Sequence, residues 1–294
     1  MRVVYLGTDA MLPCLEYLLD EHEVMALYTC GGQEDYFRSE HIANMAHEAG
    51  IPCCPEPIDE AAERRLIKDG CELFISADYG RKIPVLSEEE GFFGINIHTS
   101  LLPEGRSYCP IECALERGEI ETGVTIHKLA ERFDRGDIIS QRRLPIHPED
   151  DSIDLYLGLA AAAEAMLEEI LGDFAKFWGN AAAQGPEGSF WRLEHFRDAR
   201  LNHDMSVAEA IGIYRIYNRM TRIKVGGKVY FITALETGRA IINANINNAN
   251  INKKEILLGG QMLYRLRDGH LRLTLEEADN PDAVWECDRY PFRF

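Results

Sequence analysis

The sequence predicts an α/β protein with a doubly wound, mostly parallel, Rossmann-like sheet, followed by a smaller C-terminal β-rich domain of barrel-like character. Two observations predict this fold class. Over the first 170 residues, short apolar and β-branched runs alternate with helical patterns, the arrangement typical of parallel sheets built from strand–helix units. In the last third, short strand patterns are separated by glycine-containing turns, which is typical of a small all-β module.

The N-terminal elements follow one another at regular spacing. Strands are expected at residues 3–7, 23–29, 51–53, 73–77 and 94–97, and helices from the first turn to Leu19, over 39–49, over 59–69 and over 153–170. The first turn reads Gly7-Thr8-Asp9-Ala10, so the G-x-G-x-x-G fingerprint of dinucleotide sites is absent there. The sheet is therefore predicted without a dinucleotide-binding turn.

We expect three sections along the chain: a first domain at 1–180, a linker at 181–203 and a C-terminal β domain at 204–294. The linker loses regular periodicity and contains Gly185, Pro186 and Gly188. A helix at 206–217 begins with Ser206 and Glu209 in capping-box spacing. Strands are expected after it at 223–225, 228–235, 256–258, 262–265 and 271–275. The repetitive tract 241–252 could be a strand or a loop.

The charge of the chain is strongly negative and unevenly distributed. The net charge is −18 over 294 residues. Residues 1–200 hold 18 Lys and Arg against 38 Asp and Glu, a net −20, whereas residues 201–294 hold 13 against 11, a net +2. An acidic surface repels polyanions, so a nucleic-acid substrate is disfavoured. A basic strip is either a phosphate site or a solvated helix end and strand face; it comprises Arg215, Arg219, Arg222, Lys224 and Lys228.

Several other site classes are not expected. The apolar runs are shorter than the 18 or so residues that a membrane span needs, and the N-terminus has the pattern of a strand rather than of a signal peptide. None of the eight cysteines forms a C-x-x-C pair, so a metal site is not predicted. We expect a cytoplasmic protein with reduced thiols and no membrane association.

The chemically informative segment surrounds the strand at 94–97. Asn96 and His98 are two residues apart, so on a strand they project from the same face. An amide and an imidazole at the carboxyl end of a parallel strand can donate to an oxygen and accept a proton in one site, which is where open sheets bind ligands. Ser100-Leu101-Leu102-Pro103 then ends the strand, and Asp134 follows in the sequence Asp134-Arg135-Gly136-Asp137.

These motifs together resemble the family of folate-dependent formyltransferases. The likeness rests on Asn-x-His with Ser-Leu-Leu-Pro, Arg106, the sequence at 122–125 and Asp-x-Gly-Asp at 134–137, and it covers roughly residues 1–170. Further similar segments are the first strand, the strand at 23–29, and the sequences at 47–52 and 77–84. A weaker likeness extends to the family's C-terminal β domain.

The resemblance implies roles for particular residues. Asn96, His98 and Asp134 would be catalytic, and the donor would be 10-formyltetrahydrofolate, with no metal. The folate would contact Arg81, Lys82 and Ile83, and also Phe133 and Asp137 of the loop at 132–137; Asp137 is also expected to support that loop. The acceptor would contact Ser100, Arg106 and Tyr108, although Arg106 could instead form a salt bridge. His127 is expected to be structural or peripheral.

The acceptor amine is predicted from local features. The segment at 30–40 is net acidic where methionyl-tRNA formyltransferases place a basic loop, and it lies in the acidic part of the chain. We therefore expect a small-molecule amino sugar, carried on a nucleotide, and not nucleic acid, with a homodimer as a possible assembly. The alternatives are methionyl-tRNA as acceptor, a formyltetrahydrofolate hydrolase that uses water, and a non-catalytic binding module.

Overall fold

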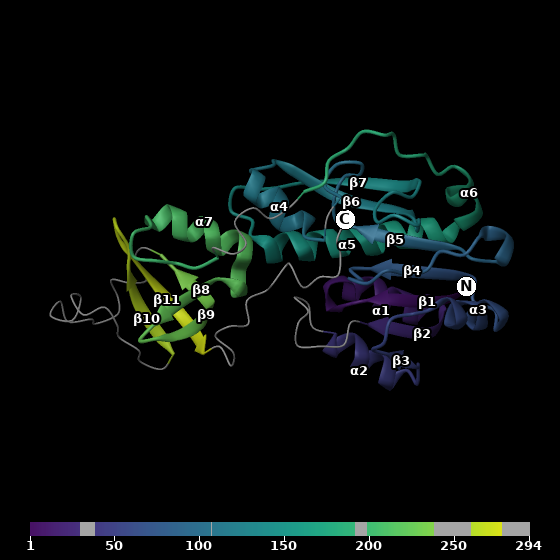
Figure 1. Cartoon of the computed structure of the whole chain (residues 1–294), viewed down its shortest axis with the longest axis horizontal. Helices are drawn as coiled ribbons and strands as arrows, with labels where there is room; N and C mark the ends of the chain where they lie inside the picture. The colour runs from purple at the N-terminus through teal and green to yellow at the C-terminus, as the bar shows by residue number, and fades with distance from the viewer. Residues whose placement is uncertain (30–38, 107, 192–198, 238–259, 278–294) are drawn as a thin grey trace. The chain divides into compact units, whose positions relative to one another are not determined.

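The structure is a computed structural model that describes residues 1–29, 39–106, 108–191, 199–237 and 260–277 (Figure 1). The chain divides into two compact units. Unit 1 comprises Met1–Pro148 and Asp154–Arg192, and unit 2 comprises Glu149–Ile153 and Leu193–Phe294. Within the described ranges, no helix is both long enough and apolar enough to cross a bilayer.

Unit 1 is built on a seven-stranded sheet with the strand order β3-β2-β1-β4-β5-β6-β7. The strands are β1 Arg2–Gly7, β2 Glu23–Thr29, β3 Cys53–Cys54, β4 Leu73–Ala77, β5 Gly94–His98, β6 Glu121–Lys128 and β7 Ile138–Pro145. β1 to β5 pair in parallel, whereas β6 and β7 are antiparallel to their neighbours. The predicted doubly wound, mostly parallel sheet is confirmed.

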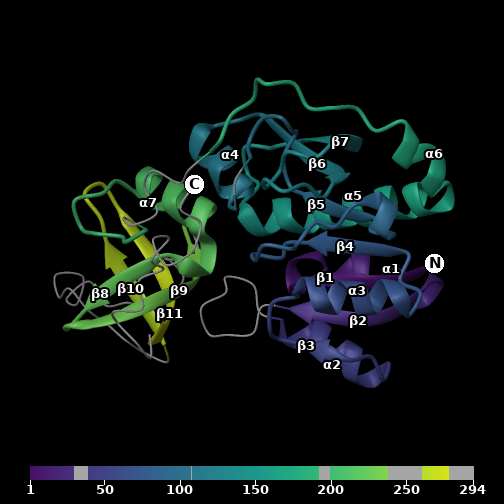
Figure 2. The same ribbon diagram turned by 45° about the vertical axis from the view of Figure 1, so that its right-hand side comes forward.

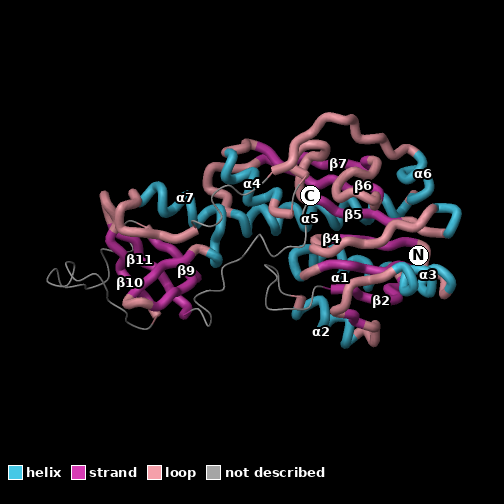
Figure 3. Tube along the Cα trace, viewed as in Figure 1, coloured by secondary structure: helices cyan, strands magenta, loops and turns pink. Residues whose placement is uncertain are grey.

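Helices connect most of the successive strands, and Figure 3 colours them cyan. They are α1 Leu12–Glu21, α2 Glu40–Glu48, α3 Glu60–Lys68, α4 Pro110–Arg117, α5 Ser152–Gly172 and α6 Phe174–Gly179, with short 3-10 turns at Asp9–Met11 and Glu88–Glu90. The helix predicted after the first turn is a 3-10 turn followed by α1. α4 was not predicted; it begins at Pro110 and ends before the left-handed Gly118. The six-residue α6 was also not predicted, and it lies in a region without clear periodicity.

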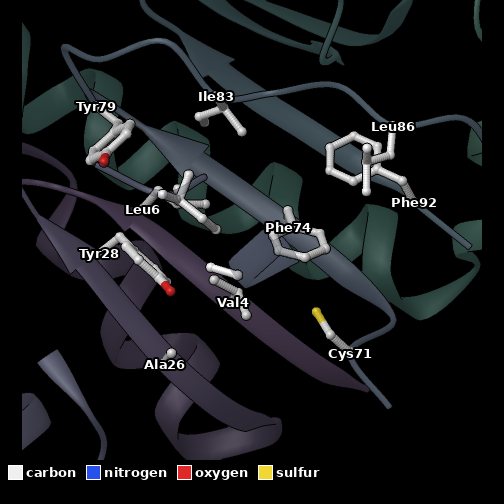
Figure 4. Close-up of a cluster of buried hydrophobic side chains, with 12 residues drawn as sticks. Val4, Leu6, Ala26, Tyr28, Cys71, Phe74, Tyr79, Ile83, Leu86 and Phe92 are labelled. Carbon is white, nitrogen blue, oxygen red and sulfur yellow. The ribbon is translucent and has the colours of Figure 1, made fainter. Parts of the chain in front are cut away.

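The alternation of side chains along the central strands explains why helices cover both faces of the sheet. Val4 and Leu6 of β1 belong to one hydrophobic cluster with Phe74 of β4 and Ala62 of α3 (Figure 4). The alternate residue Tyr5 is also fully buried, as expected for a parallel sheet that is covered on both sides. Figure 2 shows α3 in front of the strands, while α5 runs behind them in Figure 1.

The order of the strands determines at which edge of the sheet the candidate catalytic residues lie. β1 and β4 are the neighbours at which the strand order reverses, and β5 lies next to β4, so their carboxyl ends share one edge of the sheet. Ligands of open α/β sheets bind at such an edge. The antiparallel pairing of β5 with β6 sets Asn96 opposite His127 and His98 opposite Thr125. A residue 31 positions away therefore becomes a direct neighbour of Asn96.

Unit 2 contains a four-stranded antiparallel sheet in the order β10-β11-β9-β8, with α7 Val207–Tyr217 and a 3-10 turn at Asn218–Met220. Its strands are β8 Arg222–Val225, β9 Lys228–Glu236, β10 Gln261–Arg265 and β11 His270–Glu277. The predicted capping box of Ser206 and Glu209 begins α7. The tract 241–252 and the strand expected at 256–258 lie outside the described residues.

The basic strip predicted at 215–228 has different environments along its length. The Arg215 Nε donates to the backbone carbonyl of Asp150. Arg222 is buried, and the Lys228 ammonium lies 2.6 Å from a carboxylate oxygen of Glu277. Lys224 is exposed. Two of these cations are thus already engaged with groups of unit 2.

The segment expected as a linker packs differently along its length. Its first part, 181–191, belongs to unit 1, where Ala182 pairs with Ile138 at the start of β7 and Phe190 pairs with Arg106. These pairings use backbone groups, which carry little sequence signature. Ala199–Leu201 pairs with Arg222 in unit 2.

Candidate active site

His98 is the last residue of β5 and is 6% exposed. Its Nε2 lies 3.0 Å from the backbone oxygen of Gly105, which can only accept, so this contact assigns the ring proton to Nε2. In the neutral ring Nδ1 then carries the lone pair, and it lies 3.6 Å from Oδ1 of Asp134. His98 is thus arranged to accept a proton on Nδ1 beside a carboxylate that stabilises the resulting cation.

Asn96 is oriented by His127 on the neighbouring strand. The His127 Nδ1 lies 2.8 Å from the backbone oxygen of Lys128, so Nδ1 is the donor and Nε2 is the acceptor. The Asn96 Nδ2 lies 3.1 Å from this Nε2, which identifies the amide nitrogen as the group that faces His127. One hydrogen of Nδ2 remains without a partner among the described residues. A ligand oxygen could accept a hydrogen bond from it.

The charge state of His127 follows from its burial. Burial lowers the pKa of His127 to about 4, and Asp134, whose charge acts in the opposite direction, does not offset it. The ring is therefore neutral at physiological pH. A neutral ring is required for the contact with Asn96, because a protonated Nε2 would face the amide as a second donor.

Asp134 is presented by a turn with an unusual backbone. Its φ is 55°, in the left-handed region that aspartate tolerates better than most residues. Next to it, Gly136 packs against β6 so closely that a Cβ would collide with the Lys128 carbonyl oxygen. The Lys128 N–H also donates to the carbonyl of Asp137 over 2.9 Å. These contacts hold the Asp134 carboxylate between His98 and His127, whose Nε2 lies 3.8 Å from Oδ1.

The residues expected to contact folate lie in two loops. The Arg81 NH1 donates to the carbonyl of Pro55 over 2.6 Å, Lys82 is exposed, and the Ile83 side chain is part of the hydrophobic cluster in Figure 4. Phe133 is 39% exposed beside Asp134, and the Asp137 carbonyl bonds to β6. The folate contacts remain predictions, and for Ile83 they would have to use the backbone.

The residues expected to contact the acceptor have largely internal partners. The Ser100 hydroxyl is buried and donates to the Glu104 carbonyl over 2.7 Å. Arg106 is 2% exposed and its guanidinium donates to Gln184 and to backbone carbonyls, with no ion pair to a carboxylate in the described parts of the chain. Tyr108 is half-buried and interacts with another group of the protein. A role in acceptor binding stays a prediction for all three.

Two residues that were not predicted to be site residues contact this site. His127 was expected to be structural or peripheral, and its contact with Asn96 is a structural one. Gln184 was placed in a linker, yet its amide bonds to the carbonyls of Asp134 and Gly136. The antiparallel register could have indicated His127, since its position relative to Asn96 follows once β5 and β6 are paired. No local pattern pointed to Gln184.

This arrangement is suited to acyl transfer. It combines a proton acceptor, His98, with a carboxylate, Asp134, and with an amide N–H donor, Asn96, at the carboxyl end of one strand. A proton acceptor such as His98 can take the proton that an attacking nucleophile loses. An amide N–H such as that of Asn96 can donate a hydrogen bond to an oxyanion. The predicted grouping of these three residues agrees with the geometry, while their catalytic roles stay predictions.

Part of the chain is similar in sequence to known proteins. The sequence model named Formyl transferase matches residues 42–171. The methionyl-tRNA formyltransferase of Listeria innocua is 36% identical over 194 residues, which cover 63% of this chain and 62% of that protein. The match therefore spans less than two thirds of this relative's length.

Solved structures share the fold over a longer range. HypX from Aquifex aeolicus, in complex with tetrahydrofolic acid, superimposes with a TM-score of 0.65 at 17% identity, covering 94% of this chain and 44% of that one. An N-formyltransferase from Helicobacter canadensis, in complex with folinic acid and dTDP-3-aminofucose, has a TM-score of 0.57 at 16% identity and covers 94% of this chain and 99% of that one. At these identities the likeness concerns the fold.

Proposed function

We propose that this chain, whose residues 42–171 match the Formyl transferase family model, is a formyltransferase that transfers a formyl group from 10-formyltetrahydrofolate to a primary amine. The observation that carries the proposal is the convergence of Asn96, His98 and Asp134. The His98 Nδ1 lies 3.6 Å from the Asp134 carboxylate, and Asn96 projects from the same strand two residues earlier. Folate as the donor is supported by the family and by the ligands of the two solved structures described above.

In the proposed reaction the amine nitrogen attacks the formyl carbon and forms a carbon–nitrogen bond. The nitrogen must lose a proton as the bond forms, and the Nδ1 of His98 accepts it. Asp134 stabilises the imidazolium ion that results, because opposite charges at this distance in a largely buried site attract strongly. The bond between the formyl carbon and the folate nitrogen then breaks, and this nitrogen takes up the proton.

The formyl oxygen gains negative charge in the tetrahedral intermediate. The remaining Nδ2 hydrogen of Asn96 is the donor for that oxygen, with the His98 cation close by. A donor of this kind is worth roughly 3 kcal/mol of transition-state stabilisation in other acyl-transfer enzymes. The exposed ring of Phe133 beside Asp134 offers an apolar surface for the flat part of the folate.

We further propose an amino sugar, carried on a nucleotide, as the acceptor. The net charge of −18 opposes the approach of a polyanion as large as a tRNA, whereas a sugar nucleotide carries only a few charges. Methionyl-tRNA is the second candidate. It is favoured by the 36% identity to the Listeria innocua enzyme.

The test is a formyl-transfer assay with 10-formyltetrahydrofolate and purified protein. The acceptors are dTDP-3-aminofucose, a panel of UDP- and dTDP-linked amino sugars, and methionyl-tRNA, with a reaction that lacks any acceptor. We expect release of tetrahydrofolate that depends on an amino sugar and is lost in His98→Ala. Activity on the tRNA alone would refute the amino-sugar proposal, and release without an acceptor would indicate a hydrolase.

A further inference from the structure

Residues 182–191 form a strap, the name used below for this segment, that runs past both loops of the candidate site. At one end, Ala182 and Ile138 exchange two backbone hydrogen bonds of 2.8 Å. At the other end, the Arg106 N–H donates to the Ser189 carbonyl and the Trp191 N–H donates to the Arg106 carbonyl, each over 3.1 Å. The strap is therefore anchored on β7 and on the loop that follows β5.

Between these anchors, Gln184 uses both ends of its amide. Its Nε2 donates to the carbonyl of Asp134 over 2.9 Å and to the carbonyl of Gly136 over 2.8 Å. Its Oε1 accepts from the NH2 of Arg106 over 2.6 Å. The Arg106 Nε also donates to the Asp134 carbonyl over 3.2 Å. Gln184 and Arg106 thus each donate a hydrogen bond to the backbone carbonyl of Asp134, whose carboxylate faces His98.

The turn that carries Asp134 needs hydrogen bonds from outside the turn to keep its conformation. Its neighbours Arg132, Phe133 and Arg135 are exposed, and Asp134 has a backbone conformation that costs an L-residue about 1 kcal/mol. A turn of this kind relaxes unless the surrounding structure determines its conformation. The contacts to β6 hold it from one side, and Gln184 with Arg106 holds it from the other.

The amide is chemically suited to both partners. Burial is the main cause that lowers the pKa of the Arg106 guanidinium, and the nearby charge of Arg135 lowers it further. A carboxylate at position 184 could accept from Arg106, but it has no hydrogen for the two carbonyls and would oppose their lone pairs. A glutamine satisfies the arginine and the turn at the same time.

We infer that Gln184 is a positioning residue that, together with Arg106, holds Asp134 against His98. This inference rests on the proposed function, since it assigns Gln184 a part in the same site. Gln184 does not contact the reacting atoms in this scheme; it acts through the backbone of Asp134. Removing it leaves substrate binding in place and misplaces the carboxylate.

Two variants test the inference, Gln184→Met and Gln184→Glu. The first removes every hydrogen bond of the amide at similar size, and the second keeps the contact to Arg106 but removes the two donors. Gln261→Met is the matched control, since Gln261 is an exposed residue of β10 in unit 2. The measurements are kcat and KM for both substrates, per active site, and amide hydrogen exchange followed by mass spectrometry.

We expect kcat to fall about 10- to 100-fold in both Gln184 variants, with KM changed less than about twofold, because small displacements of a catalytic group cost rates of this order. Exchange should rise in peptides that cover 132–137 and stay unchanged over β4 and β5. The control should match the parent in every measurement.

Three outcomes overturn the inference. In the first, exchange over 132–137 and kcat both equal those of the parent. In the second, exchange rises throughout unit 1 while kcat per active site is unchanged, which indicates a general structural role. In the third, Gln184→Glu retains the parent kcat. The exchange measurement needs no substrate, so a chain without formyl transfer would refute the proposed function while still reporting whether Gln184 holds the turn.

Discussion

Replacement of His127 by phenylalanine tests whether its ring orients Asn96. The ring remains, but the variant loses the acceptor for the Asn96 Nδ2 and the donor to the Lys128 carbonyl. A buried hydrogen bond contributes about 1 to 1.5 kcal/mol, so the ratio of correctly to incorrectly oriented Asn96 amide should fall about 5- to 13-fold. We expect kcat to fall by up to this factor with KM unchanged. Asn96→Ala, which removes the donor itself, should cost about 100- to 1000-fold.

A double variant and a pH series complete this test. In an Asn96→Ala background, His127→Phe should cost little more, because the two residues act through one contact. In the unfolded chain His127 takes up a proton near pH 6.5, but in the folded chain only near pH 4. The unfolded state thus binds more protons in this window, and the parent loses up to about 3 kcal/mol of stability as pH falls through it.

His127→Phe should lack this part of the acid destabilisation, measured by urea unfolding at pH 7 and pH 4.5. The control is His47→Phe on the exposed side of α2, which should retain the parent's kcat and pH dependence. The reasoning is refuted if His127→Phe has the parent's kcat, or if its full effect persists when Asn96 is already absent.

Three further predictions concern the turn and a buried carboxylate. Asp134→Asn should lower kcat at least 100-fold in the transfer assay. Asp137→Asn, which could change the KM for the predicted folate contact, should change kcat less than about threefold, since Asp137 bonds to β6 through its backbone; equal effects on kcat would contradict the assignment. Gly136→Ala should lower the free energy of unfolding by about 1 to 3 kcal/mol, because its Cβ collides with the Lys128 carbonyl oxygen, and an unchanged urea midpoint would disprove this. Glu63 is 0% exposed, and its carboxylate oxygens have no hydrogen-bond partner among the described residues. Burial raises its pKa to about 8. The free energy of unfolding should therefore fall as pH rises from 4.5 through 8, because the folded state holds this proton more tightly than the unfolded state. Glu63→Gln should therefore raise Tm at pH 8.5 more than at pH 5, and equal changes in Tm would show that the carboxylate is not the cause.

Local patterns predicted the strands and helices that have a strong periodicity. β4 and β2 begin and end at the predicted residues, and α7 begins at the predicted capping box, because both signals depend on neighbouring residues alone. α6 was not predicted, because six residues give too few turns for a pattern. The pairing of residues 181–191 with unit 1 was also not predicted, because it depends on backbone groups that every residue carries.

The sequence by itself determined the fold class of unit 1 and the grouping of Asn96 with His98, since residues two apart on a strand share a face whatever surrounds them. The likeness to a family then indicated Asp134. Only the tertiary structure decided how these groups are held. His127 became the partner of Asn96 through the register of β5 with β6, and Gln184 reached the Asp134 turn from 50 residues away. Hydrogen bonds over such separations depend on the packing of the whole unit, and no local pattern encodes them.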